Sequence, residues 1–276
     1  MRKKGIYFLL IPGIVLIVFS LVLPLFSAIF KTFNSDSGFS LARYAAFFKD
    51  SYSMSVYYRT LRLSLISTVV SVVFGFPTAY YISRAKKNVK GLFIMFAVFP
   101  LLTSAVVRSF SWMVILGKNG IINNLLMNMG LIHKPLALLY NEVSIVIGFV
   151  YLFLPLMIMS LIGVMDNIDS SLLEAAESLG ASKLEAFIKV IFPLSVPGII
   201  VGSILVFTGS FTAYTTPQLL GGNKSRVLAT LVYQKAMALS DWNSASVIAT
   251  IMIITTIVIS MVINNLAARL QGRGEA

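Results

Sequence analysis

Six long apolar stretches dominate the sequence and restrict the folds open to it. Each is close to the roughly 20 residues that an α-helix needs to cross the hydrocarbon core of a bilayer. They cover about residues 6–30, 61–82, 91–112, 143–162, 194–214 and 244–264. Hydrophobic residues make up 58% of the chain and charged residues only 12%, which excludes an ordinary soluble domain. We therefore predict an all-α integral membrane protein with six transmembrane helices.

Basic clusters indicate how these helices are oriented. Residues 2–4 are basic and precede the first apolar stretch, as in a signal peptide, but that stretch is longer than a signal-peptide core. We therefore expect an uncleaved first span with its N-terminus inside. The basic cluster at residues 84–90 falls on the same side, and Trp112 and Trp242 fall at the expected outer boundary. Both termini are then expected in the cytoplasm.

The segments between the spans carry further local signals. On the outer side, residues 40–50 and 121–130 have the pattern of short helices, and residues 217–241 form a third external segment. Arg62, at the outer edge of the second span, is expected to anchor the membrane interface. Prolines inside the spans predict either packing kinks or bends around a central cavity, because neighbouring helices can satisfy the carbonyls they free. These prolines are Pro12, Pro24, Pro77, Pro100 and Pro155.

The inner segment between the fourth and fifth spans, residues 165–193, predicts two short helices joined by a sharp turn. Two serines each stand three residues before a glutamate, which is the spacing of a capping box. The pairs are Ser171 with Glu174 and Ser182 with Glu185. Gly180 lies between them, where a helix C-terminus favours a residue that tolerates positive φ. Pro193 is expected to stop the second helix or to kink it.

Both helices of this segment have an apolar stripe with helical spacing. The stripes are Leu172, Ala175, Ala176 and Leu179, and then Leu184, Phe187, Ile188 and Ile191. An apolar stripe at the membrane surface either docks a partner protein or packs on the chain's own spans. The sequence alone leaves both readings open.

Seven residues of the same segment stand in a recognisable order. They are Glu174, Ala175, Ala176, Gly180, Val190, Phe192 and Pro193. The segment resembles the cytoplasmic coupling motif of permease subunits of bacterial type I ABC importers, which reads EAA, three residues, G, nine residues, I-x-L-P. Val190 and Phe192 depart from the pattern, apolar for apolar. Residues 61–264 are also similar to permeases of the spermidine/putrescine family, most visibly in LLEAAESLGASKLEAFIKVIFPLSVPGII and PQLLGG.

The resemblance implies an importer built from several subunits. It implies a bacterial inner-membrane location, a second homologous permease, two ATPase subunits on the coupling helices and an extracytoplasmic solute-binding protein. ATP and Mg are expected on the partner ATPases, with no cofactor on this chain, and residues 1–276 are expected to form one permease domain. The residues expected to couple to the ATPases are Glu174, Ala175, Ala176, Gly180, Leu184, Phe187, Ile188 and Pro193.

The sequence lacks the residues that other functions would need. It has no cysteine and no phosphate-binding P-loop, and its one histidine, His133, falls in an external segment. No cluster has metal-ligand spacing, and the acidic residues of the segment 165–193 lie away from the membrane interior, so we do not expect an enzyme. No carboxylate lies inside a span, which argues against an ion-coupled secondary transporter. The net charge of +12 does not indicate nucleic-acid binding, because the cations lie in loops between spans.

A few polar residues in the spans are candidates for the wall of a translocation path. Arg108 lies near the outer end of the third span, and it either faces the path or is structural, by snorkelling or by an ion pair. Hydroxyls near the end of the fifth span either line the path or bond the helix's own carbonyls. The candidates are Arg108, Ser104, Ser210, Thr212 and Tyr214.

The transported solute stays open at this stage. The family resemblance points to polyamines or related amine-bearing solutes. Arg108 would suit an opine, a phosphonate or another anionic or zwitterionic solute better, because a guanidinium pairs with anions. Whether the partner permease is identical to this chain is equally open.

Overall fold

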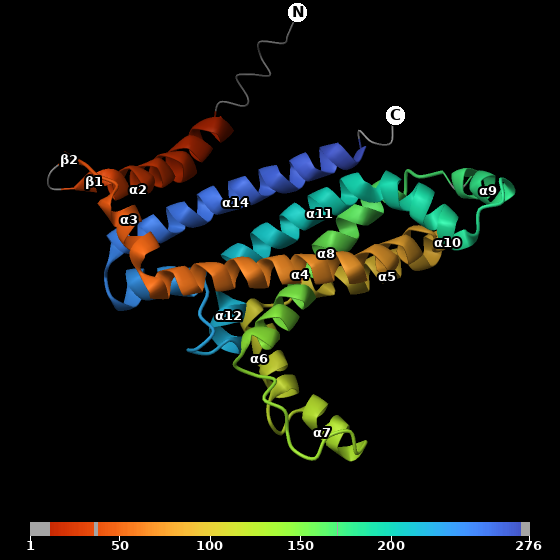
Figure 1. Ribbon diagram of the computed structural model, residues 1–276, viewed down its shortest axis with the longest axis horizontal. Helices are drawn as coiled ribbons and strands as arrows, with labels where there is room; N and C mark the ends of the chain where they lie inside the picture. Colours follow the sequence, from red (N-terminus) through yellow and green to blue (C-terminus); the bar gives the residue numbers. More distant parts are fainter. Residues whose placement is uncertain (1–11, 36–37, 170, 272–276) are drawn as a thin grey trace, which may run out of the picture. The chain divides into compact units, whose positions relative to one another are not determined.

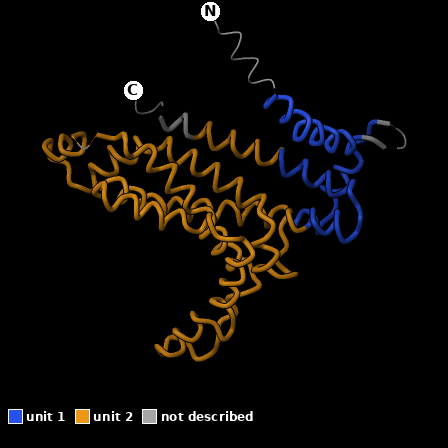
Figure 2. The backbone as a smooth tube through the Cα atoms, turned by 180° about the vertical axis from the view of Figure 1, so that it is seen from behind, with its two compact units in different colours: residues 1–55, 231–253 blue, residues 56–230, 254–276 orange. Residues whose placement is uncertain are grey.

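The computed structural model describes residues 12–35, 38–169 and 171–271, and side chains at all of these except 34, 35, 38 and 267–271. The chain divides into two compact units (Figure 2). Unit 1 contains residues 1–55 and 231–253. Unit 2 contains residues 56–230 and 254–276.

Unit 1 begins with an apolar helix, Pro12–Phe33, in which Thr32 is buried and the other described side chains are exposed or half-buried. It includes the π-helical turn η1 (Val18–Val22) and α2 (Leu23–Phe33), and the predicted residues 6–11 of this span lie outside the described part. Two-residue strands, β1 (Asn34–Ser35) and β2 (Gly38–Phe39), pair antiparallel before α3 (Ala42–Lys49). Helix α3 confirms the short helix predicted at residues 40–50.

Four further elements contribute to unit 1. The first turn of α4 (Ser51–Ser83) follows α3 directly. From the second half of the chain come the end of α13 (Leu228–Tyr233), the π-helical turn η3 (Gln234–Ala238) and the first part of α14 (Trp242–Gln271) (Figure 1). The sequence had predicted only an external segment before the sixth span, so η3 and α13 are additions.

The core of unit 2 is the pair formed by α8 (Glu142–Met165) and α11 (Phe192–Thr212). Small residues let the two backbones approach closely, as in other membrane helix pairs. A Cβ on Gly202 would lie 2.5 Å from the sulfur of Met157, and Ser160 Oγ donates a hydrogen bond of 2.8 Å to the carbonyl of Gly198. Helix α4 packs on this pair through Phe76 and its neighbours.

The number of helices suited to crossing a membrane agrees with the predicted six spans. By length and composition, five helices of the described residues qualify: 12–33, 51–83, 142–165, 183–212 and 242–266. A sixth is possible if a bent pair, α5 (Lys87–Leu102) with the helices that follow from Ala105, counts as one span. The helices extend beyond two of the predicted spans, because α4 begins at Ser51 and α14 at Trp242, whereas these spans are predicted from about residues 61 and 244.

The third span is broken, which corrects the continuous helix predicted for residues 91–112. Helix α5 ends at Leu102, and α6 (Ala105–Leu116) begins after two extended residues, Thr103 and Ser104. The two helical segments meet at an angle of 97°. A hydropathy pattern does not register this break, because apolar residues continue on both sides of it.

The external segment after α6 folds around one asparagine. Helix α7 (Ile121–Asn128) confirms the short helix predicted there. The buried side chain of Asn123 donates to the carbonyls of Gly117 and Leu136, each at 3.0 Å, and accepts from the Leu136 amide at 2.8 Å. These bonds close the loop that follows α7. Helix α12 (Thr215–Leu220), which the sequence did not predict, follows α11 and packs on α6 and α8.

Candidate functional site

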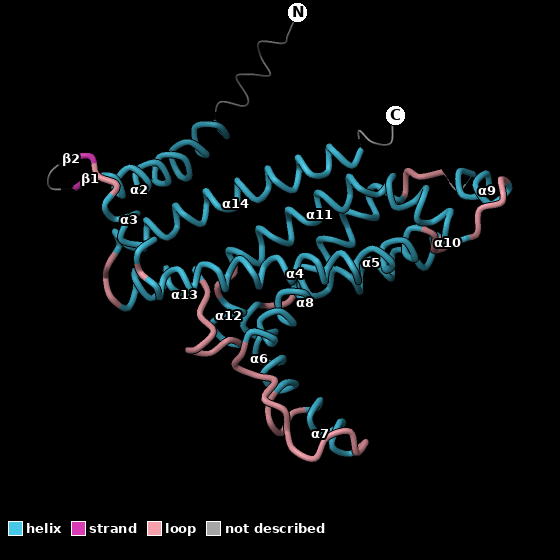
Figure 3. Tube along the Cα trace, in the orientation of Figure 1, coloured by secondary structure: helices cyan, strands magenta, loops and turns pink. Residues whose placement is uncertain are grey.

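The cytoplasmic segment forms the sharp turn that the sequence predicts. Helix α9 (Ser171–Ser178) is followed by Gly180, two residues after its last residue. The φ of Gly180, +91°, lies in the left-handed region. The Gly180 amide donates to the Glu177 carbonyl at 3.0 Å, and the Ala181 amide reaches back to the Ala176 carbonyl at 3.1 Å. This pair of bonds is the Schellman arrangement, which needs a residue tolerant of positive φ. The hairpin of α9 and α10 (Lys183–Ala186) appears in Figure 3.

One of the two predicted capping boxes is present. Ser182 Oγ accepts from the Glu185 amide at 3.3 Å, and the Glu185 carboxylate accepts from the Ser182 amide at 3.0 Å. The other box is wrong, because Ser171 is already the first residue of α9. Its amide donates instead to the Asp169 side chain at 2.9 Å. The hydrogen bonds from Ser171 hold the pKa of the Asp169 carboxyl below its usual value.

The second helix of the hairpin is not short, and Pro193 does not stop it. A π-helical turn, η2 (Phe187–Ile191), joins α10 to α11, so one helix runs over 30 residues from Lys183 to Thr212. Pro193 stands in the first turn of α11, just after the π-helical turn. Such a turn is a recognised way for a helix to absorb an irregularity in its hydrogen-bond ladder. The second helix of the hairpin and the fifth span therefore form one uninterrupted helix.

The apolar stripe on the second helix has two parts. One part packs on the chain's own helices, and the other is exposed and free to contact a partner protein. Phe187 packs on the chain's own α4, with its ring 4.9 Å from that of Tyr80 and 5.5 Å from that of Phe76. Ile191 is fully buried in the same cluster. Leu184 and Ile188 are instead 68% and 54% exposed. Phe187 thus seats the hairpin on α4, and the exposed part of the stripe is what remains for a partner.

The exposed part continues across the turn. Leu179, at the end of α9, is 89% exposed, and Leu172 is also exposed. We call Leu172, Leu179, Leu184 and Ile188 the exposed apolar set. Glu174 and Ala175 of the family motif are exposed as well, and Ala176 is half-buried. The apolar residues among these can act only by shape and apolar contact, whereas Glu174 also presents an exposed carboxylate.

Two cations, Arg84 between α4 and α5 and Lys90 in the first turn of α5, hold the start of the coupling segment. Lys90 Nζ lies 2.6 Å from both carboxylate oxygens of Asp166, at the end of α8. Arg84 Nη2 donates to the Ile168 carbonyl at 3.2 Å, and its guanidinium lies 5.9 Å from the centre of the Tyr80 ring. The sequence-based prediction used these two cations only to assign the loop to the inner side of the membrane. Their partners lie more than 70 residues further along the chain, so spacing could not have found them.

Arg108 lies at the bend between α5 and α6. It is 8% exposed, and its Nη1 donates to the Pro100 carbonyl at 2.6 Å and to the Thr103 carbonyl at 3.2 Å. No carboxylate of the described residues lies within 4 Å of it. Arg108 therefore neither snorkels nor forms an ion pair, and it instead satisfies carbonyls that the end of α5 leaves without helical partners.

A cavity of about 210 Å³ adjoins this arginine. Its wall contains Arg108 with Trp112 and Tyr151, whose rings meet edge to face with their centres 5.5 Å apart. Thr103 and Ser111 add hydroxyls to the same wall. Aromatic faces attract cations, and hydroxyls can accept hydrogen bonds from amines. The aromatic pair was missing from the sequence-based candidates, since Trp112 had been read only as an interface residue.

The other candidates for the path do not gather at this cavity. The hydroxyl of the fully buried Ser210 donates to the Val206 carbonyl of its own helix at 2.7 Å. Thr212 is exposed and bonds the Thr208 carbonyl at 2.8 Å. Ser104 is exposed and precedes α6, and the half-buried Tyr214 precedes α12. Only Arg108 of the predicted set lines the cavity.

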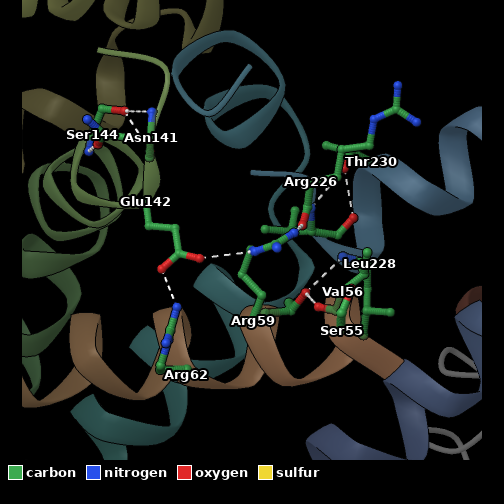
Figure 4. A network of polar contacts seen from close by, with 12 residues as sticks. Ser55, Val56, Arg59, Arg62, Asn141, Glu142, Ser144, Arg226, Leu228 and Thr230 are labelled. Atoms are coloured by element: carbon green, nitrogen blue, oxygen red, sulfur yellow. Dashed lines mark hydrogen bonds and ion pairs between the residues drawn. The ribbon is translucent and has the colours of Figure 1, made fainter. Parts of the chain in front are cut away.

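The N-terminal parts of α4 and α8 are joined by a charged network (Figure 4). Glu142, the first residue of α8, accepts from Arg59 Nε at 3.0 Å and pairs with Arg62. Arg59 also donates to the Arg226 carbonyl at 3.2 Å. Arg62 is therefore an ion-pair partner of Glu142, a contact that the sequence did not predict. Thr60 adds a further link by accepting from the Leu228 amide at 2.9 Å.

Comparison with known proteins identifies the family. Residues 67–273 match the family described as "Binding-protein-dependent transport system inner membrane component". The chain belongs to this family. It is 30% identical over 248 residues to the spermidine/putrescine transport system permease protein PotB of Haemophilus influenzae, covering 88% of this chain and 83% of that protein. It is 32% identical over 183 residues to PotB of Escherichia coli, covering 66% of each.

Solved structures support the fold. A bacterial ABC transporter involved in the import of the acidic polysaccharide alginate matches with a TM-score of 0.77 at 18% identity, covering 97% of this chain and 96% of that one. The alginate transporter in complex with its alginate pentasaccharide-bound periplasmic protein matches with a TM-score of 0.80 at 17% identity, over 98% and 96%. The chain therefore has the fold of an ABC importer permease, in a family of inner-membrane components that work with binding proteins.

Proposed function

We propose that this chain is one permease subunit of an ATP-driven importer for spermidine, putrescine or a related amine-bearing solute. It spans the inner membrane with both termini in the cytoplasm. A second homologous permease completes the path, an extracytoplasmic solute-binding protein delivers the solute, and two ATPase subunits carry ATP and Mg. The likeness to the PotB relatives supports the solute class.

The observation that carries the coupling role is the continuity of the hairpin with the fifth span. Helix α10 runs without interruption through η2 into α11. The exposed apolar set covers the free side of the hairpin, while Phe187 fixes the other side on α4. A partner that moves the hairpin would therefore move α11 as a rigid body.

The mechanism follows from this continuity. Closure of an ATPase dimer draws the two coupling hairpins together, and each hairpin carries its fifth span with it. Because α11 packs tightly on α8, the two helices rotate as one body between inward-open and outward-open states. ATP drives the cycle by having different affinities for the two states.

The cavity beside Arg108 supports an amine-bearing solute through its aromatic faces. Trp112 and Tyr151 offer π-faces, while Arg108 directs Nη1 at backbone carbonyls. The alternative, an anionic or zwitterionic solute, is favoured by one observation: Nε and Nη2 of Arg108 make no hydrogen bond to any described residue. A guanidinium with unused donors can pair with a carboxylate or phosphonate.

Uptake into proteoliposomes separates these solute classes. The reconstituted importer, with its binding protein outside and ATP inside, is offered labelled spermidine, putrescine, an opine and a phosphonate. We expect the polyamines to be taken up and the other two solutes to be excluded. Uptake of the opine or phosphonate without polyamine uptake would replace the proposed solute class by the alternative.

A further inference from the structure

Unit 1 contains a pocket of mixed charge that shares no residue with the coupling segment or the Arg108 cavity. Its volume is about 300 Å³. Helix α3, the first turn of α4, η3 and the first turns of α14 supply its wall. Phe47, Val247 and Ile248 form an apolar part, and all three are buried. Arg43, Lys235 and Asp50 form the charged part.

The two cations of the pocket have hydrogen-bond donors to spare. Arg43 directs Nη1 at the Lys31 carbonyl, 3.1 Å away, and makes no other hydrogen bond to a described residue. Lys235 Nζ lies 3.9 Å from the nearest oxygen of Asp241, which is beyond hydrogen-bond range. An arginine and a lysine so placed on one wall are suited to a phosphate group.

The carboxylate of the pocket is held in a fixed position. Asp50 Oδ2 accepts from the Ser53 amide at 3.0 Å and from the Ser53 hydroxyl at 2.6 Å, so it caps the start of α4. These bonds lower the pKa of Asp50 from its usual value, with a smaller contribution from Lys235. Asp50 is therefore ionised at neutral pH and can face an ammonium group.

The surroundings of the pocket are those of a membrane interface. Phe48, Tyr52 and Trp242, which are neighbours in sequence of its wall residues, are all exposed, and aromatic side chains concentrate at the headgroup level of bilayers. The apolar helix at residues 12–33, in the same unit, has exposed apolar side chains along most of its length and is suited to acyl chains. With both termini in the cytoplasm, this interface is the outer one.

We propose that this pocket binds the headgroup of a zwitterionic phospholipid that carries a primary ammonium group, as in phosphatidylethanolamine. The phosphate lies between Arg43 and Lys235, the ammonium group lies at Asp50, and the glycerol end lies over Phe47. The charge pattern decides between lipid classes. A purely anionic headgroup would meet Asp50 unfavourably, and a quaternary ammonium could not donate a hydrogen bond to it. The site is independent of which solute the importer carries.

Lipid retention by the purified full chain tests the proposal. Native mass spectrometry in detergent measures the fraction of protein bound to phosphatidylethanolamine, phosphatidylcholine or phosphatidylglycerol at matched concentrations. We expect preferential retention of phosphatidylethanolamine. Lys235→Gln and Arg43→Gln should each weaken it about tenfold, as expected for one charge-assisted hydrogen bond. Asp50→Asn keeps an oxygen for the Ser53 amide but should abolish the preference over phosphatidylglycerol.

The controls keep the outcome decisive. Lys49→Gln removes an α3 cation that does not line the pocket and should leave lipid binding unchanged. The Lys235 side chain makes no hydrogen bond to a described residue, so Lys235→Gln removes only the long ion pair of 3.9 Å with Asp241 besides the proposed phosphate contact. Equal retention of all three lipids, or unchanged binding in Lys235→Gln, would overturn the proposal. So would displacement of the lipid by free phosphoethanolamine or by spermidine, which would make the pocket a site for soluble solutes.

Discussion

At the scale of single residues, two backbone irregularities are held by residues that few others could replace. Gly180 supplies the positive φ at the hairpin turn, and Arg108 satisfies carbonyls at the bend between α5 and α6. The first was predictable, because helix caps, turn and glycine lie within a dozen residues of one another. The second was not, since the break at Thr103 and Ser104 lies within a continuous apolar stretch. The sequence indicates that Arg108 is a charge inside a span. The carbonyls that it binds, those of Pro100 and Thr103, are available only because the helix breaks there.

The first prediction concerns Gly180. Replacement by Val would force a β-branched side chain into the left-handed region at a cost of about 1–3 kcal/mol, although no atom lies within 4 Å of an added Cβ. We expect Gly180→Val to insert normally but to lose most uptake. Gly180→Asn is the matched control, because Asn tolerates positive φ, and it should retain most uptake. The measurement is ATP-driven uptake at equal protein in the membrane, and near-normal uptake by Gly180→Val would refute the hairpin account.

The second prediction concerns Arg108. One nitrogen of Arg108, Nη1, donates to both carbonyls, and lysine keeps the charge but lacks the planar guanidinium that fixes the position of this nitrogen. We expect Arg108→Lys to reduce uptake several-fold and Arg108→Ala nearly to abolish it. Arg108→Ala should also lower the thermal unfolding temperature, because the Thr103 carbonyl loses the Nη1 donor, at about 1–3 kcal/mol for an unsatisfied group, whereas the Pro100 carbonyl still accepts from the Thr103 hydroxyl at 2.9 Å.

Uptake and thermal stability, measured on the same preparations, check the Arg108 prediction. Thr103→Val is a useful companion, since it removes a wall hydroxyl of the cavity but leaves the Thr103 carbonyl in place. Wild-type uptake by both Arg108 variants would remove this residue from any role in the path or its support.

At the scale of elements, the cytoplasmic hairpin is part of a longer helix and not a separate module. The predicted amphipathic stripe had the correct helical period. It combined residues that pack on α4, such as Phe187, with residues that are exposed, such as Leu184. Phe187 packs on Tyr80 and Phe76, more than 100 residues earlier, so no local pattern could assign it. The same is true of the pairing of Arg62 with Glu142. Local signals such as the Ser182 capping box were recovered, whereas contacts between distant elements were not.

The third prediction separates docking from packing on this helix. Leu184→Asp places a charge on the exposed apolar set and should release the ATPase subunits while leaving the permease as stable as wild type. Phe187→Ala should instead lower the unfolding free energy by roughly 2 kcal/mol, because a half-buried aromatic ring leaves α4. Lys183→Asp, an exposed change next to Leu184, is the control for charge alone.

Co-purification of the ATPase subunits and thermal unfolding of the permease are the two readouts for this pair. Retention of the full complex by Leu184→Asp would contradict the assignment of the exposed apolar set to the ATPase. A destabilised Leu184→Asp permease would contradict it as well, because it would show that Leu184 packs within the chain.

At the scale of the whole molecule, the number of spans and the fold of an importer permease could be read from the apolar stretches and from the EAA motif. The matches to solved importer structures and to the family confirm the fold, and the described residues contain five helices suited to crossing a membrane, or six if the bent pair is one span. The solute is a different matter. The wall residues that we propose for solute recognition, Trp112 and Tyr151, approach one another only after α6 and α8 have packed.

The source of energy tests the central claim most directly. The importer is reconstituted into proteoliposomes with its ATPase subunits, with binding protein outside, and labelled spermidine uptake is measured with and without internal ATP and with ionophores that dissipate ion gradients. We expect uptake to require ATP and binding protein and to be unaffected by the ionophores. Uptake that persists without ATP and collapses when the ion gradients are dissipated would contradict the account.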